Sequence, residues 1–225
     1  PKHAQEFVNK RLQDTQNPLP ADIQWRYQLA KLRYDSQQAA VLLQTLPRIE
    51  SAVEFEVLCR KMFRELSDRP TSAIDTELAE LAKSFTASEH DHRARLRVVV
   101  ALAVFDPQHA WTKGDSARIA SDLARADPAW LAVCNRWIPG AHCQSDIALA
   151  LQQLASQRDS NSEDADQAAA ILAEWKINQP RELVLLLQSA SLTQLPRIVD
   201  VIRAFPAQVA SELQKQATAS LAELQ

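Results

Sequence analysis

Apolar residues recur along most of the chain at the three- and four-residue spacing of amphipathic helices, and proline-containing breaks separate these stretches. The first stretch, residues 3–16, ends at the Asn-Pro-Leu-Pro sequence of residues 17–20, because proline disfavours helical geometry in the residue before it. A second helix is expected over residues 22–34, and Asp35-Ser36 can cap a third. The pattern predicts short helices in series.

The starts and buried faces of two later helices can also be predicted. Pro47 is expected to open a helix, because proline is favoured at the first helical position. The apolar positions expected on this helix include Ile49, Val53, Val57, Met62 and Leu66. Ser88, with Asp91 three residues later, resembles a capping box before the next apolar run.

The chain also resembles itself at long range. Tyr34, Phe105 and Ile177 each close an apolar helix end and are followed by Asp or Asn, and Leu-Pro-Arg-Ile occurs at residues 46–49 and 195–198. This similarity predicts three degenerate units of roughly four helices each. The alternative is that a helical chain rich in alanine and leucine aligns with itself by chance. The predicted units are residues 20–87, 88–160 and 161–225.

We therefore expect an all-α fold: a right-handed α-solenoid of HEAT-like, stacked antiparallel helix pairs, with about 12 to 13 helices. Residues 1–225 would form one helical-repeat domain, with the helix of residues 3–16 as its cap. The glycine content agrees, since the chain has 2 glycines and glycine supplies the left-handed conformations that tight hairpin turns require.

Predicted helices alternate with short proline-containing motifs, two of them with Asp-Pro. This pattern is most complete in the middle of the chain, at residues 105–107 (Phe-Asp-Pro), 125–128 (Arg-Ala-Asp-Pro) and 138–139 (Ile-Pro). It resembles the degenerate HEAT-like helical regions of large bacterial multidomain proteins, some of which carry a serine/threonine kinase or formylglycine-generating-enzyme-like domain. The resemblance covers roughly residues 20–220 and implies a helical spacer. The enzymatic signatures of such proteins, a glycine-rich loop, His-Arg-Asp and Asp-Phe-Gly, are absent from this sequence.

The charge and the cysteine content limit which binding partners and which cellular compartment are expected. The net charge of −3 gives no global positive field, so neither nucleic acid nor a membrane surface is the expected partner. The 3 cysteines are too few for a disulfide framework and indicate reduced thiols in the cytoplasm. No apolar run has the length of a spanning helix. Because the chain begins at Pro1 without a methionine, we expect it to be a segment of a longer protein.

Candidate reactive groups do not form a recognisable site. His90-Asp91-His92 has residues that can ligate a metal, but neighbours at i and i+2 do not share a helix face. Cys134 and Cys143 lack the spacing of zinc sites. We therefore predict no catalytic residue, no metal and no cofactor, and we expect that the segment is not an enzyme.

The most suggestive local feature is an insertion in the middle unit that carries Trp111, Lys113 and Asp115. Insertions in repeats form loops, and a tryptophan on a loop can anchor a partner, so these three residues are the predicted partner-binding site. The alternative is that Trp111 folds back to cover an apolar gap. Asp115 or Ser116 is the expected cap of the helix that follows.

The sequence thus favours a non-catalytic protein–protein interaction module, scaffold or spacer, whose partner is another protein or a neighbouring domain of the same polypeptide. Two alternatives stay open at this stage. The helices could enclose a small-molecule or catalytic pocket, or the segment could be a regulatory, autoinhibitory part of an adjacent enzyme.

Overall fold

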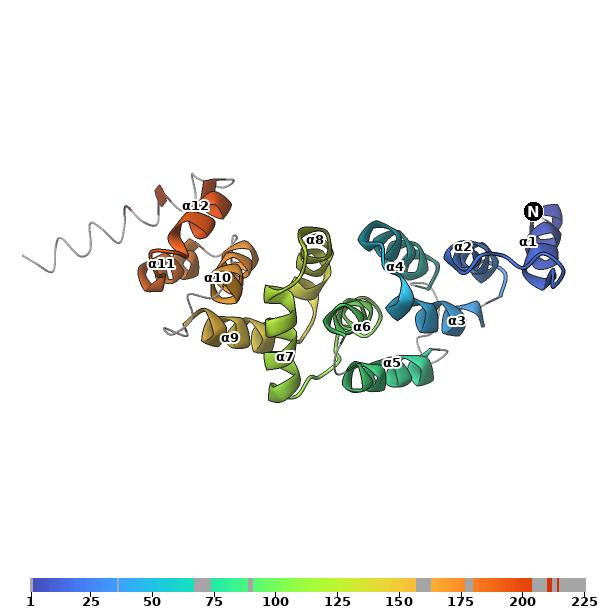
Figure 1. The fold of residues 1–225 in the computed structure, drawn as a ribbon, viewed down its shortest axis with the longest axis horizontal. Helices are drawn as coiled ribbons and strands as arrows, with labels where there is room; N and C mark the ends of the chain where they lie inside the picture. The colour runs from blue at the N-terminus through green and yellow to red at the C-terminus, as the bar shows by residue number, and fades with distance from the viewer. Residues whose placement is uncertain are drawn as a thin grey trace, which may run out of the picture. The chain divides into compact units, whose positions relative to one another are not determined.

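The computed structural model describes residues 2–35, 37–66, 74–88, 91–156, 163–176, 180–203, 210–211 and 214. These residues form twelve α-helices and two short 3₁₀ turns, and none of them lies in a β-strand (Figure 1). The expected all-α class is confirmed. Within the same residues, no helix is both long enough and apolar enough to cross a membrane.

The contacts between helices divide the chain into two compact units. Unit 1 takes in residues 1–109 and 128–142, and unit 2 takes in residues 110–127 and 143–225. The helices of unit 1 are α1 (Lys2–Gln13), α2 (Ala21–Leu32), α3 (Gln38–Thr45), α4 (Ala52–Leu66), α5 (Asp75–Ala87), α6 (His92–Phe105) and α8 (Pro128–Trp137), with 3₁₀ turns at Leu46–Arg48 and Ile138–Gly140. Those of unit 2 are α7 (Lys113–Ala124), α9 (Gln144–Ala155), α10 (Glu163–Trp175), α11 (Pro180–Ser189) and α12 (Leu195–Arg203).

Helix α6 is the centre of unit 1. Its sequence from Leu96 to Phe105 is apolar with the exception of Arg97, and residues 95–102 are all buried. A helix that is apolar on every side must be covered on every side, and α6 accordingly packs against α4, α5 and α8. These neighbours are amphipathic and bury one face each.

Two arginines on α6 are buried with it. The guanidinium of Arg97 donates to the Pro47 carbonyl at 2.6 Å and lies 5.2 Å above the Trp130 ring, and that of Arg95 donates to the Ser88 carbonyl at 2.7 Å. Each arginine therefore satisfies a carbonyl at the C-terminal end of a neighbouring helix or 3₁₀ turn, where the helix dipole favours a cation. Burial lowers the pKa of Arg97. Neither arginine is available to an external phosphate.

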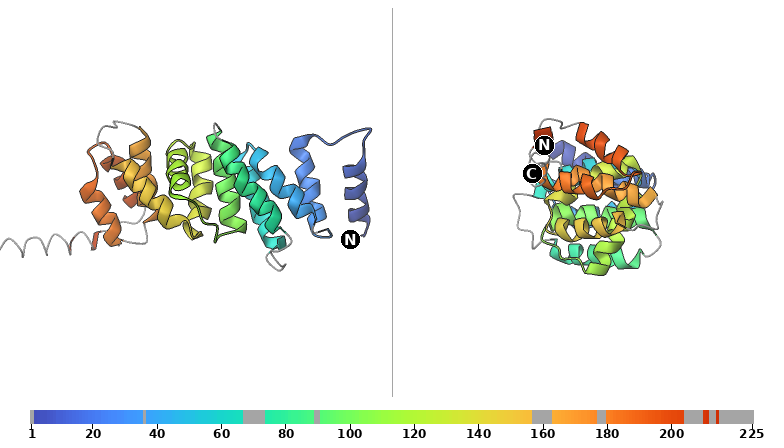
Figure 2. Two further views of the ribbon diagram at one scale, coloured as in Figure 1. Left: turned by 90° about the horizontal axis from the view of Figure 1, so that it is seen from below. Right: turned by 90° about the vertical axis from the view of Figure 1, so that its left-hand side faces the viewer.

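The other helices of unit 1 contact their neighbours along the chain. Helix α2 packs against α1, α3 and α4, α3 packs against α5, and α4 packs against α8. Figure 2 shows the helices of this unit lying roughly side by side.

Helix α10 is the centre of unit 2 and packs against α7, α9, α11 and α12. Four of its buried residues are alanines, which let the neighbouring helices approach closely: Ala165, Ala168, Ala169 and Ala173. On one side, Ala169 and Ala173 form a core with Leu183 and Val184 of α11 and Ile198 of α12. The alanine-rich stretch of α10 thus holds α11 and α12 in place.

The predicted start of α4 was wrong, and so was part of its predicted apolar face, although Met62 is buried as predicted. Pro47 lies in a 3₁₀ turn, and α4 begins at Ala52, where the Ser51 hydroxyl accepts a hydrogen bond from the Glu54 backbone N–H. Val53 and Val57 are 70% and 38% exposed. The buried face consists instead of Ala52, Phe55, Leu58, Cys59 and Met62. The two valines share the helical spacing, but Phe55, which touches Trp130 edge-on at 5.1 Å, fixes which face turns inward.

Other helix boundaries also differ by a few residues. Helix α6 is capped by Asp91, whose carboxylate accepts from the Ala94 N–H at 2.9 Å, while Ser88 ends α5, so the predicted capping box was wrong. Helix α1 ends at Gln13 because Asp14 accepts the backbone N–H groups of Asn17 and Gln16. The third helix begins at Gln38, and its N-cap position is Gln37, which makes no side-chain capping bond. Asp35 accepts the Gln37 N–H at 3.1 Å without being the cap, and Ser36 lies outside the described residues.

The three-unit repeat stays a prediction. Of its marker positions, Phe105 is buried, Tyr34 is exposed, and Ile177 lies outside the described residues. Of the tryptophans in helices, Trp25, Trp130 and Trp175 are buried and Trp137 is half-buried.

Phe55→Ala is expected to lower the free energy of unfolding by about 3 to 5 kcal/mol, because it opens a cavity under Trp130 in a fully buried site. The matched control is Phe63→Ala on the same helix, where the ring is 47% exposed and a loss within about 1 kcal/mol is expected. Urea unfolding followed by circular dichroism measures both. Equal losses would show that the buried face of α4 is assigned incorrectly.

Candidate functional site

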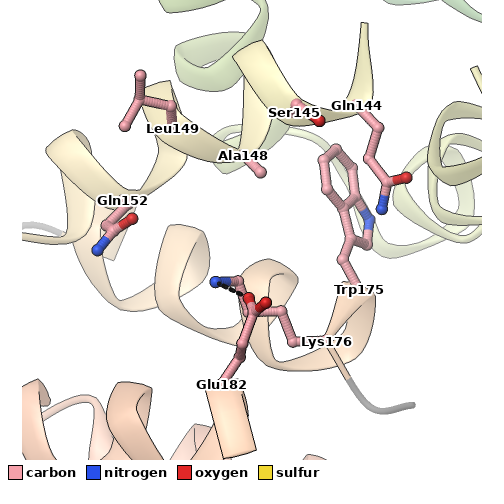
Figure 3. A pocket seen from close by; sticks show the side chains of 8 residues that line it. All are labelled: Gln144, Ser145, Ala148, Leu149, Gln152, Trp175, Lys176 and Glu182. Carbon is pink, nitrogen blue, oxygen red and sulfur yellow. Dashed lines mark hydrogen bonds and ion pairs between the residues drawn. The ribbon is translucent and has the colours of Figure 1, made fainter. Parts of the chain in front are cut away.

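The candidate site is a groove in unit 2 between α9 and α11, with the end of α10 as its floor (Figure 3). It consists of two adjoining hollows of about 360 and 320 Å³, which share the lining residues Gln152, Lys176 and Glu182. We call it the α9/α11 groove. Its shape depends on α10, which packs against both of the helices that form its walls.

One wall is the outer face of α9. Ser145, Ala148, Leu149 and Gln152 follow the i, i+3, i+4, i+7 spacing that places them in one stripe. The opposite face of the helix carries Ile147 and Leu151, which are fully buried. Leu149 therefore does not belong to the core, and its side chain is 54% exposed.

The other wall is a matching stripe on α11: Glu182, Leu185, Leu186 and Ser189. Helix α11 is held by Leu183 and Val184, both fully buried in the core of unit 2. That anchoring turns Leu185 outward, and its side chain is also 54% exposed. Two helices thus present one half-exposed leucine each to the same groove.

The floor contains Leu172, Trp175 and Lys176 from the last turn of α10. The ammonium of Lys176 lies 2.8 Å from a carboxylate oxygen of Glu182, so its charge is matched within the groove. Figure 3 shows this pair and Trp175 across from the α9 side chains. The remaining lining is apolar or carries uncharged amides and hydroxyls.

This set of groups is suited to binding more than to bond cleavage. Among the described residues that line the groove there is no histidine or cysteine, and Lys176 and Glu182 neutralise each other. The two serines, Ser145 and Ser189, have no base beside them in the lining. Apolar side chains with a few amides match a surface that a partner helix can cover.

Sequence reasoning missed this groove. The sequence feature that could have indicated it is a leucine at a position outside the helix's buried stripe. Leu149 lies halfway between the buried Ile147 and Leu151, and Leu185 directly follows the buried Leu183 and Val184. A leucine in such a position is either unremarkable surface or part of a contact face. Only the packing of α9 and α11 against α10 shows that the two leucines line one groove.

The loop predicted to bind a partner lies elsewhere in unit 2. Trp111 is half-buried and its indole hydrogen-bonds the Cys143 thiol, so the ring folds back as in the alternative interpretation. Burial raises the pKa of that thiol, and the hydrogen bond opposes this shift. Lys113 is exposed. The partner-binding role of Trp111, Lys113 and Asp115 stays a prediction.

Asp115 takes part in a capping box at the start of α7. The Thr112 hydroxyl accepts from the Asp115 N–H at 3.2 Å, and the Asp115 carboxylate accepts from the Thr112 N–H at 3.3 Å. The residue that caps α7 is therefore Thr112, three and four residues before the predicted candidates Asp115 and Ser116. The cap and the Trp111–Cys143 contact together fix how the chain enters α7.

A second hollow, of about 400 Å³ in unit 1, contains a histidine. His109 Nδ1 lies 3.2 Å from the Asp106 carboxylate, and Asp75 lines the same hollow. A histidine held by a carboxylate can act as a base, but the lining supplies no serine, threonine or cysteine for it to activate. His142 is exposed, and His90 lies outside the described residues together with the first part of the His90-Asp91-His92 motif.

The cysteines and acidic residues do not assemble into a metal site in the part of the chain that the structure describes: no three His, Cys, Asp or Glu side chains gather there. Cys59, Cys134 and Cys143 are buried, and none of them forms a disulfide bond within the described residues. Burial strongly raises the pKa of Cys59.

Comparison with known proteins gives no relative. The sequence has no significant match to a protein-family model, to a curated protein or to a solved structure.

Thr112→Ala is expected to lower the free energy of unfolding by about 1 kcal/mol, because it removes the hydroxyl that satisfies the first turn of α7. The control is Thr86→Ala at an exposed position in the last turn of α5, where the same change should be neutral or slightly stabilising. Chemical denaturation curves measure the free energy of unfolding of the two variants and of the unaltered chain. If Thr112→Ala were no more harmful than the control, the capping box would contribute nothing to stability.

Proposed function

We propose that this chain is a non-catalytic protein-interaction module and that the α9/α11 groove binds an amphipathic helix of a partner protein. The observation that carries the proposal is the pair of leucines, Leu149 and Leu185, each half-exposed on facing walls of one uncharged groove. Covering an exposed leucine contributes roughly 1 to 2 kcal/mol, so two of them supply a useful part of a moderate affinity.

The chemistry of the groove favours a helix over a charged ligand. Its walls are two helical stripes, and a partner helix with apolar residues at i, i+3 or i+4, and i+7 can place them between such stripes. Gln144, Gln152, Ser145 and Ser189 offer donors and acceptors at the margins. The Lys176–Glu182 ion pair leaves little net charge to attract an ion.

We further propose that the helices stack as HEAT-like pairs, so that the module acts as a scaffold in the cytoplasm. Within unit 1 most of the contacts join helices one or two places apart along the chain, as in stacked repeats, and α4 with α8 is the exception. The central helices of the two units, α6 and α10, are four helices apart, in agreement with units of four helices. Three free, buried thiols fit a reducing compartment.

Selection of helical peptides from a display library on the immobilised chain tests the binding function. Enriched peptides are expected to carry an apolar stripe, and a Leu149→Glu/Leu185→Glu double variant should bind them about tenfold more weakly or worse, because both contacts are replaced by charge. Fluorescence anisotropy with the selected peptides measures the loss.

The matched control is Leu192→Glu, which changes a leucine that is 86% exposed and outside the groove. It should retain full peptide affinity, and circular dichroism should be the same for all variants. Failure to enrich any peptide, or equal binding by the double variant, would disprove this function for the groove.

A further inference from the structure

Unit 1 has a groove of different character between α2 and α4. It measures about 330 Å³ and is lined by Arg26, Leu29, Ala30, Arg33, Lys61, Arg64 and Glu65. The α2 residues follow the spacing i, i+3, i+4, i+7, and those of α4 follow i, i+3, i+4. Two stripes on neighbouring helices therefore face one hollow, which we call the α2/α4 groove.

The α2/α4 groove is rich in cations. Four of its seven lining side chains are arginine or lysine, and one is a carboxylate. Arg26 is paired with Glu54 at 2.6 Å, and Arg33 lies 3.5 Å from Glu65. Lys61 is exposed and makes no ion pair within the described part of the chain. Two of the four cations are thus matched by carboxylates, and the exposed ammonium of Lys61 leaves the groove with an excess of positive charge.

This excess stands out because the chain as a whole has a net charge of −3. A local positive groove on an acidic protein attracts negative groups to that place and leaves the rest of the surface repulsive to them. Electrostatic complementarity of this kind selects a partner by charge.

The groove also differs from a phosphate-binding surface. Its floor includes Leu29, which is buried, and Ala30, whose small side chain leaves room above it. Glu54 and Glu65 interrupt the cations, so a continuous row of phosphates would meet repulsion at these positions. A ligand whose carboxylates are separated by an apolar side chain can place its charges away from both Glu54 and Glu65. Arginine holds carboxylates through two parallel N–H donors, which suits such a ligand.

We propose that the α2/α4 groove binds an acidic segment of a partner protein. Carboxylates of the segment would contact Lys61, Arg64 and Arg33, and an apolar side chain would cover Ala30 and Leu29. The site is independent of the α9/α11 groove, because it lies in the other unit and uses charge where that groove uses exposed leucines.

The test uses a short fluorescein-labelled peptide of glutamates around a central leucine, and its counterpart with glutamine in place of glutamate. The acidic peptide is expected to bind the whole chain at low salt and to weaken as ionic strength rises, and the glutamine peptide should not bind. Lys61→Gln should weaken binding roughly threefold and Lys61→Glu roughly tenfold, since the second change replaces attraction by repulsion.

Lys83→Glu is the matched control, with the same charge reversal on exposed α5 of the same unit, outside the groove, and it should bind like the unaltered chain. Circular dichroism and melting curves establish that all variants are folded. Equal affinity of Lys61→Glu and Lys83→Glu, or no binding of the acidic peptide at low salt, would overturn the proposal. So would equal or tighter binding of a single-stranded oligonucleotide of similar length, which would assign the groove to phosphates. The Leu149→Glu/Leu185→Glu variant should bind the acidic peptide normally, so this proposal and the helix-binding function can fail separately.

Discussion

The structure depends on covering the long apolar stretches of two helices, α6 and α10. Helix α6 in unit 1 and helix α10 in unit 2 bury nearly their whole circumference, so each must be surrounded by other helices of its unit. Helix α6 also buries two charged side chains, Arg95 and Arg97, which need hydrogen-bond partners in the core. Each donates to a carbonyl at the end of a neighbouring helix or turn. The hydrophobic effect thus selects the neighbours, and the arginines fix how they meet.

Surrounding a central helix has a consequence for the outer ones. An outer helix needs one apolar face to bury, and its other face is free of any packing requirement. Where two outer helices lie against the same centre, their free faces border a groove, as α9 and α11 do beside α10. The residues in those free stripes determine the chemistry. Unit 2 places leucines there. In unit 1, α2 and α4 pack against each other, and the groove between them carries arginine and lysine.

The helices could be predicted from the sequence because the chain has few glycines and many prolines between periodic stretches. Their faces were less predictable. Val53 and Val57 satisfy the helical period as well as Phe55 does, and only the position of Trp130 on another helix decides that the phenylalanine turns inward. Caps were misplaced by up to three residues for a similar reason, since several Ser, Thr and Asp side chains near each helix start can act as a cap.

The sequence by itself determined the helical class, the approximate helix positions and the absence of a disulfide framework, because these follow from local periodicity, from proline and from composition. The tertiary structure decided the rest. Whether Trp111 faces solvent or Cys143, and whether Leu149 and Leu185 are scattered surface residues or the two sides of a groove, depends on contacts between residues far apart in the chain. The spacing along a helix determines in which direction a side chain points from the helix axis. Only the packing between helices determines which residues, or whether solvent, lie in that direction.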